Sequence, residues 1–192
     1  METIIHSRTR ANMAEFERAA RAAKLVRDAI WPLMNDKADR KLDGRLTREM
    51  INVIRTDKLS GHGYRNVLDG DIKLLTGFAF NNTGLNFVLE RKISTKINRA
   101  SGELSLTIPS FIPKDFIQSP PGRSHFRLYF VTVAIDFHNN SFESAKACSP
   151  EFLLSEETEQ ITLLNSITPN SPHPLFLFIG IGKGLSILEI NI

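Results

Sequence analysis

An alternation of apolar and polar residues runs through residues 93–108, ISTKINRASGELSLTI. In the first half every second residue from Ile93 to Ile97 shares a face, and in the second half every second residue from Leu104 to Ile108 does so. A period of two is that of a β-strand with one buried face. Ala100-Ser101-Gly102 supplies a glycine-containing loop between the halves. This stretch therefore predicts a β-hairpin, the clearest in the chain.

More strands are expected after the hairpin. Residues 126–137 are apolar on both faces in their first half, which is typical of a central strand or of one with a bulge. Asn139-Asn140 follows as a turn, and further strands are expected at residues 142–148, 160–167 and 175–181. No helix of crossover length separates these segments, so an antiparallel sandwich or a partly open barrel is favoured over parallel units.

The part of the chain before residue 76 has the helical period instead. Apolar residues recur at helical spacing from Phe16 to Leu33, and Asn12 with Glu15 has the spacing of a capping box at a helix start. A second helical pattern runs from Leu46 to Ile54. A third and shorter one covers residues 64–75, with Gly77 placed to end it in a left-handed conformation.

Charge and aromatic content change at the same point. Residues 1–75 hold 15 Lys and Arg against 11 Asp and Glu, whereas residues 76–192 hold 9 against 10. Phe16 is the only phenylalanine before residue 76, and the other 12 of the 13 follow it. We therefore predict an α+β protein, with a helical unit of two to three helices over residues 1–77 and an antiparallel β-sandwich-like domain over residues 78–192.

Composition limits the class of protein. The 192 residues are 42% hydrophobic and 23% charged, as in soluble globular proteins, and no apolar run approaches the length of a membrane span. Residues 1–10 lack the apolar segment of a secretory signal, so we expect a cytoplasmic protein, with export by another route left open. The single cysteine, Cys148, excludes an internal disulfide and is expected to be a buried or half-buried side chain.

The motifs that suggest chemistry are weak, and we predict no catalytic, cofactor-binding or metal site. Residues 180–184, GIGKG, lack the spacing and the following helix of a phosphate-binding loop and indicate a turn between strands. The five histidines lack the close spacing of a metal pair. His62 is best explained as an exposed turn residue, and Ser124, His125 and Asp136 have no nucleophile elbow beside them. The acidic residues at 156, 157 and 159 are interpreted as a solvated rim.

The basic residues of the helical region allow a second interpretation. Arg18, Arg21, Arg45 and Arg48 are candidates for contact with a nucleic-acid backbone. Acidic residues are interleaved with them, and the region has no helix-turn-helix spacing and no aromatic platform. An ordinary solvated helix face is therefore favoured, and nucleic-acid binding stays the alternative.

Whole segments of the chain resemble an uncharacterised family of small Bacteroidota proteins with N-terminal helices and a C-terminal β domain. The segments are residues 10–27, 45–50, 65–70, 75–81, 97–104, 108–113, 125–128 and 174–177. The family has no established activity or catalytic residue, so the resemblance implies none here. Its members have an additional strand-like segment before the first helix and a longer aromatic strand pair at the end, and without them the sheet is expected to carry unpaired edges.

These observations favour a non-enzymatic structural or protein-interaction protein. Unpaired strand edges accept strands from other chains, so self-assembly into a homo-oligomer through the sheet edges is the first hypothesis. The partner is then the protein itself or another protein, and no cofactor or small-molecule substrate is indicated. An unrecognised hydrolase centred on His62 or His125 is the least favoured hypothesis.

Overall fold

The computed structural model describes residues 2–33, 41–80, 93–117, 122, 124–181 and 184–192. The chain divides into two compact units. The first unit contains Met1–Thr76 with Ile135–Phe142, and the second contains Gly77–Ala134 with Glu143–Ile192. The first unit is therefore built from two separate pieces of sequence.

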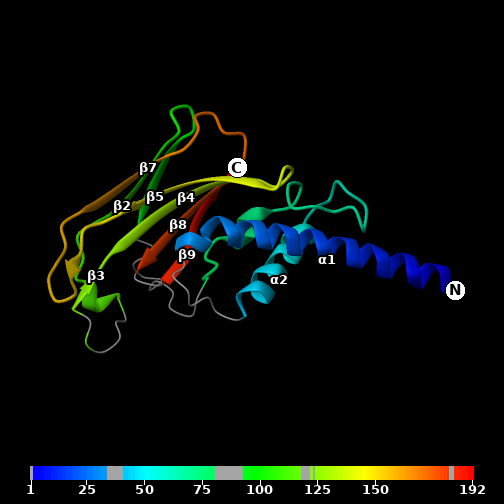
Figure 1. Ribbon diagram of the computed structural model, residues 1–192, viewed down its shortest axis with the longest axis horizontal. Helices are drawn as coiled ribbons and strands as arrows, with labels where there is room; N and C mark the ends of the chain where they lie inside the picture. Colours follow the sequence, from blue (N-terminus) through cyan, green and yellow to red (C-terminus); the bar gives the residue numbers. More distant parts are fainter. Residues whose placement is uncertain (1, 34–40, 81–92, 118–121, 123, 182–183) are drawn as a thin grey trace. The chain divides into compact units, whose positions relative to one another are not determined.

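The first unit is mainly helical. Its helices are α1 (Glu2–Ile30), α2 (Leu42–Arg55) and the short 3-10 helices η1 (Trp31–Leu33) and η2 (Ile72–Leu75). α1 packs against α2; the two helices are drawn in blue and cyan in Figure 1. Each helix contributes one apolar stripe to their contact. The buried residues of these stripes include Ala19, Val26 and Ile30 of α1 and Leu46, Met50 and Val53 of α2. The predicted stripe of α2 is confirmed, and that of α1 is confirmed from Ala19 to Ile30, whereas Phe16, placed at its start, is 57% exposed.

The start of the first helix differs from the prediction. α1 begins at Glu2, so Asn12 lies inside the helix and is not its N-cap. Residues 2–11 contain neither glycine nor proline, and nothing in them stops the helix from extending toward the N-terminus. At the other end, the α-helix stops at Ile30, two residues before Pro32, whose ring and missing N–H cannot be accommodated in a helix interior.

The third predicted helix is wrong for most of its length. Residues 64–71 form turns and bends, and only Ile72–Leu75 is helical, as a single 3-10 turn. Polar side chains take the backbone N–H groups that a helix would use: Asp57 accepts from Asn66 N, and the Asn66 side chain accepts from the N–H groups of Leu68 and Asp69. Gly77 follows with φ of +82°, the left-handed conformation that the sequence predicts.

The second unit carries most of the β-structure, and its strands pair antiparallel, as β1–β2, β2–β7, β3–β6, β4–β8 and β8–β9 show. One sheet has the order β1-β2-β7, a second pairs β3 with β6, and a third has the order β5-β4-β8-β9. The strands are β1 (Ser94–Asn98), β2 (Glu103–Ile108), β3 (His125–Phe126), β4 (Leu128–Asp136), β5 (Ser141–Cys148), β6 (Phe152–Leu153), β7 (Ile161–Ser166), β8 (Leu175–Ile181) and β9 (Gly184–Asn191). The chain is therefore α+β.

The predicted hairpin is confirmed. β1 pairs with β2 so that Thr95 lies opposite Leu106 and Ile97 lies opposite Leu104. Gly102 in the connecting turn has φ of +75°, which favours glycine. The central strand predicted over residues 126–137 is confirmed for Leu128–Asp136, because β4 lies between β5 and β8 and is buried along nearly all of its length. Phe126 belongs instead to β3, which pairs with β6.

One buried cluster contains apolar side chains from the two larger sheets. It joins Leu104, Leu106 and Ile108 of β2 and Leu163 of β7 to Leu128, Phe130 and Ala134 of β4 and Leu175, Leu177 and Ile179 of β8. On the other face of β8, Phe178 meets Phe80 at an edge-on angle with ring centroids 5.7 Å apart. The buried phenylalanines of the described residues, at positions 80, 111, 126, 130, 176 and 178, thus belong to the core of the β-rich unit.

Candidate functional site

A buried ion pair holds the loop after α2 against α1 in the first unit. The carboxylate of Glu15, only 7% exposed, accepts from Arg65 Nε and Nη2 at 2.7 Å each and from Gly63 N at 2.8 Å. Burial alone raises the pKa of Glu15, but the hydrogen bonds from Arg65 and Gly63 outweigh it and leave the pKa below its ordinary value. Gly63 has φ of +93°, and a Cβ there would lie 2.8 Å from Ala11 Cβ. The loop and the helix are thus fitted closely together.

Asp57 organises the same loop from its other side. Its side chain is 4% exposed and accepts from the N–H groups of Leu59, Ser60 and Asn66 at 2.8 to 3.1 Å. Burial raises the pKa of Asp57, and the three backbone donors lower it further than burial raises it. By accepting hydrogen bonds from three backbone N–H groups, the Asp57 carboxylate stabilises the conformation of the loop.

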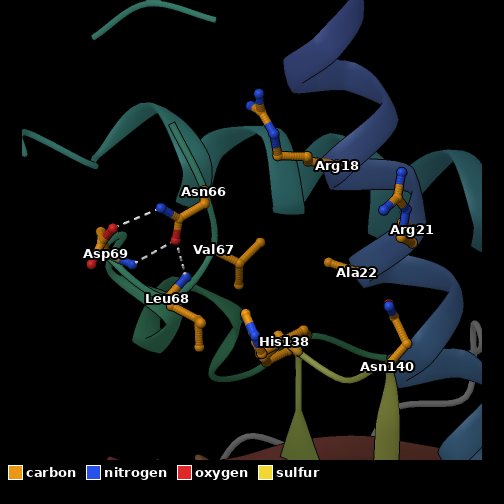
Figure 2. Close-up of a pocket in the computed structure, with 10 residues that line it drawn as sticks. Arg18, Arg21, Ala22, Asn66, Val67, Leu68, Asp69, His138 and Asn140 are labelled. Atoms are coloured by element: carbon orange, nitrogen blue, oxygen red, sulfur yellow. Dashed lines mark hydrogen bonds between the residues drawn. The ribbon is translucent and has the colours of Figure 1, made fainter. Parts of the chain in front are cut away.

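A cavity of about 350 Å³ lies in the first unit, next to this loop. Figure 2 shows that its walls come from α1, from residues 66–69 and from the turn after β4. Polar groups on the walls include Arg18, Arg21 and His138, while Ala22 and Val67 provide apolar surface. The sequence connects none of these segments, and the fold alone brings them together.

Arg18 is fixed at this cavity by the loop behind it. Its Nη1 donates to Arg65 O at 2.7 Å, and its Nη2 donates to Gly63 O. No carboxylate lies within ion-pairing distance of Arg18 among the described residues. Backbone carbonyls accept hydrogen bonds without cancelling a full charge, so a half-buried cation lies on the cavity wall.

The turn between β4 and β5 forms the opposite wall. Asp136 accepts from the N–H groups of His138 and Asn139 at 2.9 and 3.0 Å, and Asn140 adopts a left-handed φ of +52°. These features hold the turn in one shape and place His138 and Asn140 at the cavity. The Asn139-Asn140 turn was predicted from the sequence, but its position at a cavity was not.

The four arginines singled out from the sequence have different surroundings. Arg18 and Arg21 both line the cavity, whereas Arg45 and Arg48 lie on α2 and do not. Arg21 and Arg48 are both exposed and each forms an ion pair with a glutamate. Arg21 Nη2 lies 2.7 Å from Glu17 Oε1, and Arg48 Nε lies 3.4 Å from Glu49 Oε1. Arg18 and Arg45 are half-buried. The four therefore do not form one exposed row of unpaired cations.

The candidate catalytic histidines are surface residues with polar neighbours. His62 Nε2 lies 2.8 Å from Asn12 Oδ1, and His125 Nδ1 lies 2.9 Å from Ser124 Oγ. Both histidines are exposed. In the part of the chain that the structure describes, no three His, Cys, Asp or Glu side chains are grouped as metal ligands would be.

The outer edge of β7 is a second feature of interest, in the second unit. β7 is the terminal strand of its sheet, and its sequence, ITLLNS, contains no charge and no proline. Leu164 on its outer face is 69% exposed. No backbone hydrogen bond from outside the β2–β7 ladder reaches residues 161–166 among the described residues.

Several remaining sequence expectations are settled by exposure. Glu156, Glu157 and Glu159 are exposed, as expected for a solvated rim. Cys148 is exposed, so the expectation of a buried or half-buried thiol is wrong. It lies near the end of β5, the terminal strand of its sheet. No helix in the described ranges has both the length and the apolar character needed to cross a membrane.

Comparison of the chain with protein-family models, with curated proteins and with solved structures found no match.

Proposed function

We propose that this protein is a non-enzymatic interaction protein that self-associates through the outer edge of β7. The observation that carries the proposal is an edge strand without charge, proline or bulge, with an exposed leucine at its centre. The backbone N–H and C=O groups on such an edge are available to pair with another strand. A second copy of the chain is the proposed partner.

The other edge strands of the two larger sheets, β1, β5 and β9, are better protected than β7. Gly77 N donates to Ile187 O at 2.9 Å and Ile187 N donates to Phe78 O at 3.0 Å, so a preceding segment covers part of the β9 edge. β1 carries Lys96 and β5 carries Lys146, and a lysine on an edge strand disfavours pairing with another strand. This contrast supports β7 as the site of association.

Two copies of β7 match each other when they pair antiparallel about a twofold axis centred on Leu164. In that register the two Leu164 side chains face each other, and Thr162 of each copy lies opposite Ser166 of the other. Glu159, the nearest charged residue before β7, then lies opposite Pro169, so no like charges oppose each other. The pairing would cover the most exposed apolar side chain of the sheet.

The test is light scattering after size-exclusion chromatography over a range of concentrations. We expect a species of twice the 21.6 kDa chain mass for the unmodified protein. Leu164→Lys places two ammonium groups opposite each other and is expected to weaken association at least about tenfold. Ser94→Lys, which lies on the same exposed face of the sheet but on the β1 edge and in the neighbouring row of Thr107 and Thr162, is the control and should not change the mass.

Two results would overturn the proposal. One is a strictly monomeric protein at the highest attainable concentration. The other is equal loss of association in the Leu164→Lys variant and the Ser94→Lys control. Circular dichroism of each variant shows whether the fold is retained, which the exposure of both positions leads us to expect.

We also infer that the two larger sheets of the second unit form a β-sandwich. The buried apolar cluster that the two sheets share supports this. Hydrogen bonds also join β9 to the β1–β2 hairpin: Arg99 Nε and Nη2 donate to Asn191 Oδ1 and O at 2.8 and 2.9 Å, and the Thr95 hydroxyl donates to the Glu189 carboxylate. On the opposite side, Thr168 N donates to Glu143 at 2.8 Å. Nuclear Overhauser contacts between Leu106 and Phe130 side chains would test it, and their absence would contradict it.

A further inference from the structure

The cavity of the first unit has the size of a site for a small ligand. Its volume of about 350 Å³ falls within the range of roughly 300 to 1,000 Å³ found for ligand-binding cavities. Its walls come from three segments that are held in place by their own hydrogen bonds: α1, the loop braced by Asp57 and Asn66, and the turn held by Asp136. A cavity with such walls keeps its shape without a ligand.

The charge at the cavity favours an anion. Arg18 and Arg21 line it, against one carboxylate, Asp69. Asp69 already accepts from Asn66 Nδ2 at 2.6 Å, and Arg21 pairs with Glu17 at the surface. Arg18 therefore supplies the uncompensated charge, and its fixed guanidinium has unused N–H groups, since the two carbonyls occupy only two of its five donors.

The remaining surface favours an apolar body on the same ligand. Leu68, which is 54% exposed, and the half-buried Phe137 offer most of this apolar surface, whereas Ala22 and Val67 lie on the wall but are only 7% and 6% exposed. Figure 2 shows Val67 and Ala22 between the arginines on one side and His138 on the other. An inorganic ion would leave this apolar surface in contact with water.

We propose that this cavity binds a small organic carboxylate, with its carboxylate at Arg18 and Arg21 and its apolar body against Leu68 and Phe137. Guanidinium groups bind carboxylates through paired, charge-assisted hydrogen bonds, which suits a fixed arginine. The apolar body adds stabilisation in proportion to the area it covers. The site lies in the first unit and is independent of the β7 edge.

The first test compares three probes by isothermal titration and by amide chemical shifts of the full chain. Benzoate carries both features, benzyl alcohol lacks the charge, and inorganic phosphate lacks the apolar body. We expect saturable binding of benzoate with shifts at residues 66–69 and 137–140, and at least about tenfold weaker binding of the other two. Equal binding of benzoate and benzyl alcohol, or of benzoate and phosphate, would overturn the proposal.

The second test uses two exposed arginines that each pair with a glutamate on their own helix. Arg21→Gln removes a charge from the cavity wall and is expected to weaken benzoate binding by about threefold to tenfold. Arg48→Gln removes a charge outside the cavity and should leave the affinity unchanged. Equal effects of the two substitutions would indicate only a change in net charge and would contradict the site.

A third variant addresses the fixed arginine without removing its charge. Arg18→Lys keeps the cation but loses the planar fork, and it is expected to weaken benzoate binding about tenfold with a retained fold. If this variant loses its fold, Ala22→Leu provides the same information, because a larger side chain fills the cavity without changing any charge. Unchanged affinity in a folded Arg18→Lys or Ala22→Leu variant would overturn the proposal.

Discussion

Glu15 is the single side chain on which the helix-to-loop contact of the first unit most depends. It accepts three hydrogen bonds while nearly excluded from water, and Arg65 supplies two of them. Removing one partner of a buried ion pair leaves the other charge without compensation, which costs about 3 to 5 kcal/mol. We therefore expect Glu15→Gln to lower the free energy of unfolding by about 3 kcal/mol, measured by urea denaturation.

The matched control lies on the same helix two residues away. Glu17 pairs with Arg21 at the surface, where an ion pair contributes about 0 to 1 kcal/mol. Glu17→Gln should therefore change the free energy of unfolding by less than about 1 kcal/mol. A similar loss of unfolding free energy in the Glu15→Gln and Glu17→Gln variants would show that the burial of Glu15 does not determine its contribution to stability.

The same carboxylates make stability depend on pH. The pKa values of Glu15 and Asp57 lie below their ordinary values of 4.5 and 3.8, so the unfolded chain binds protons more readily than the folded one. Their contribution is complete above these ordinary values and is lost as the pH falls through the lower folded values. The free energy of unfolding should decrease below about pH 5, and less steeply in Glu15→Gln. Urea denaturation across pH 3 to 7, roughly, measures both slopes.

At the scale of elements, the β1–β2 hairpin depends on Gly102. A Cβ at this position would lie 2.1 Å from Ile167 O, and the φ of +75° disfavours other residues. Gly102→Ala is therefore expected to destabilise the protein by about 1 to 3 kcal/mol. Gly44→Ala is the matched control: nothing lies within 4 Å of its Cβ position in α2, so a gain of about 0.5 to 1 kcal/mol is expected. Thermal unfolding of the two variants measures both changes. A Gly102→Ala variant as stable as the unmodified protein would contradict the turn geometry.

Asn165 of β7 joins elements from different sheets. Its amide Nδ2 donates to Phe130 O at 3.1 Å, to Thr132 Oγ1 at 3.2 Å and to Ala145 O at 3.3 Å. Asn165→Asp replaces this donor by a buried charge facing oxygens and should cost about 3 kcal/mol or more. Asn170→Asp, the same substitution at an exposed position five residues later, should change stability by less than about 0.5 kcal/mol. Equal stability of the two variants in urea would contradict this role of Asn165.

The elements were predictable where one face of a segment is buried along its whole length. The alternation from Ile93 to Ile108 predicted both strands and their turn, and the stripe from Leu46 to Ile54 predicted α2. The loop after α2 was mistaken for a helix because its apolar residues have helical spacing, while the side chains of Asp57 and Asn66 capture its backbone N–H groups. Such capture depends on tertiary position, which local spacing does not report.

For the whole molecule, the sequence did not predict the candidate site. Arg18 and Arg21 were singled out only as possible nucleic-acid contacts, because they belong to the basic helical region. Val67 and His138 were not, because the groups that complete the cavity come from a loop and a turn far away in sequence. Asn12 and Glu15 were assigned to a helix cap, whereas they bind the loop at residues 61–65. Only long-range packing distinguishes these roles.

The return of Ile135–Phe142 to the first unit has a practical consequence for dissecting the protein. A fragment that stops at Thr76 keeps both long helices and both cavity arginines, yet it lacks Phe137, His138 and Asn140 from the cavity wall. Such a fragment should fail to take up benzoate even where circular dichroism shows it to be helical. Adding the peptide 135–142 through a designed linker, rather than extending the fragment to residue 134, is what would restore the missing wall.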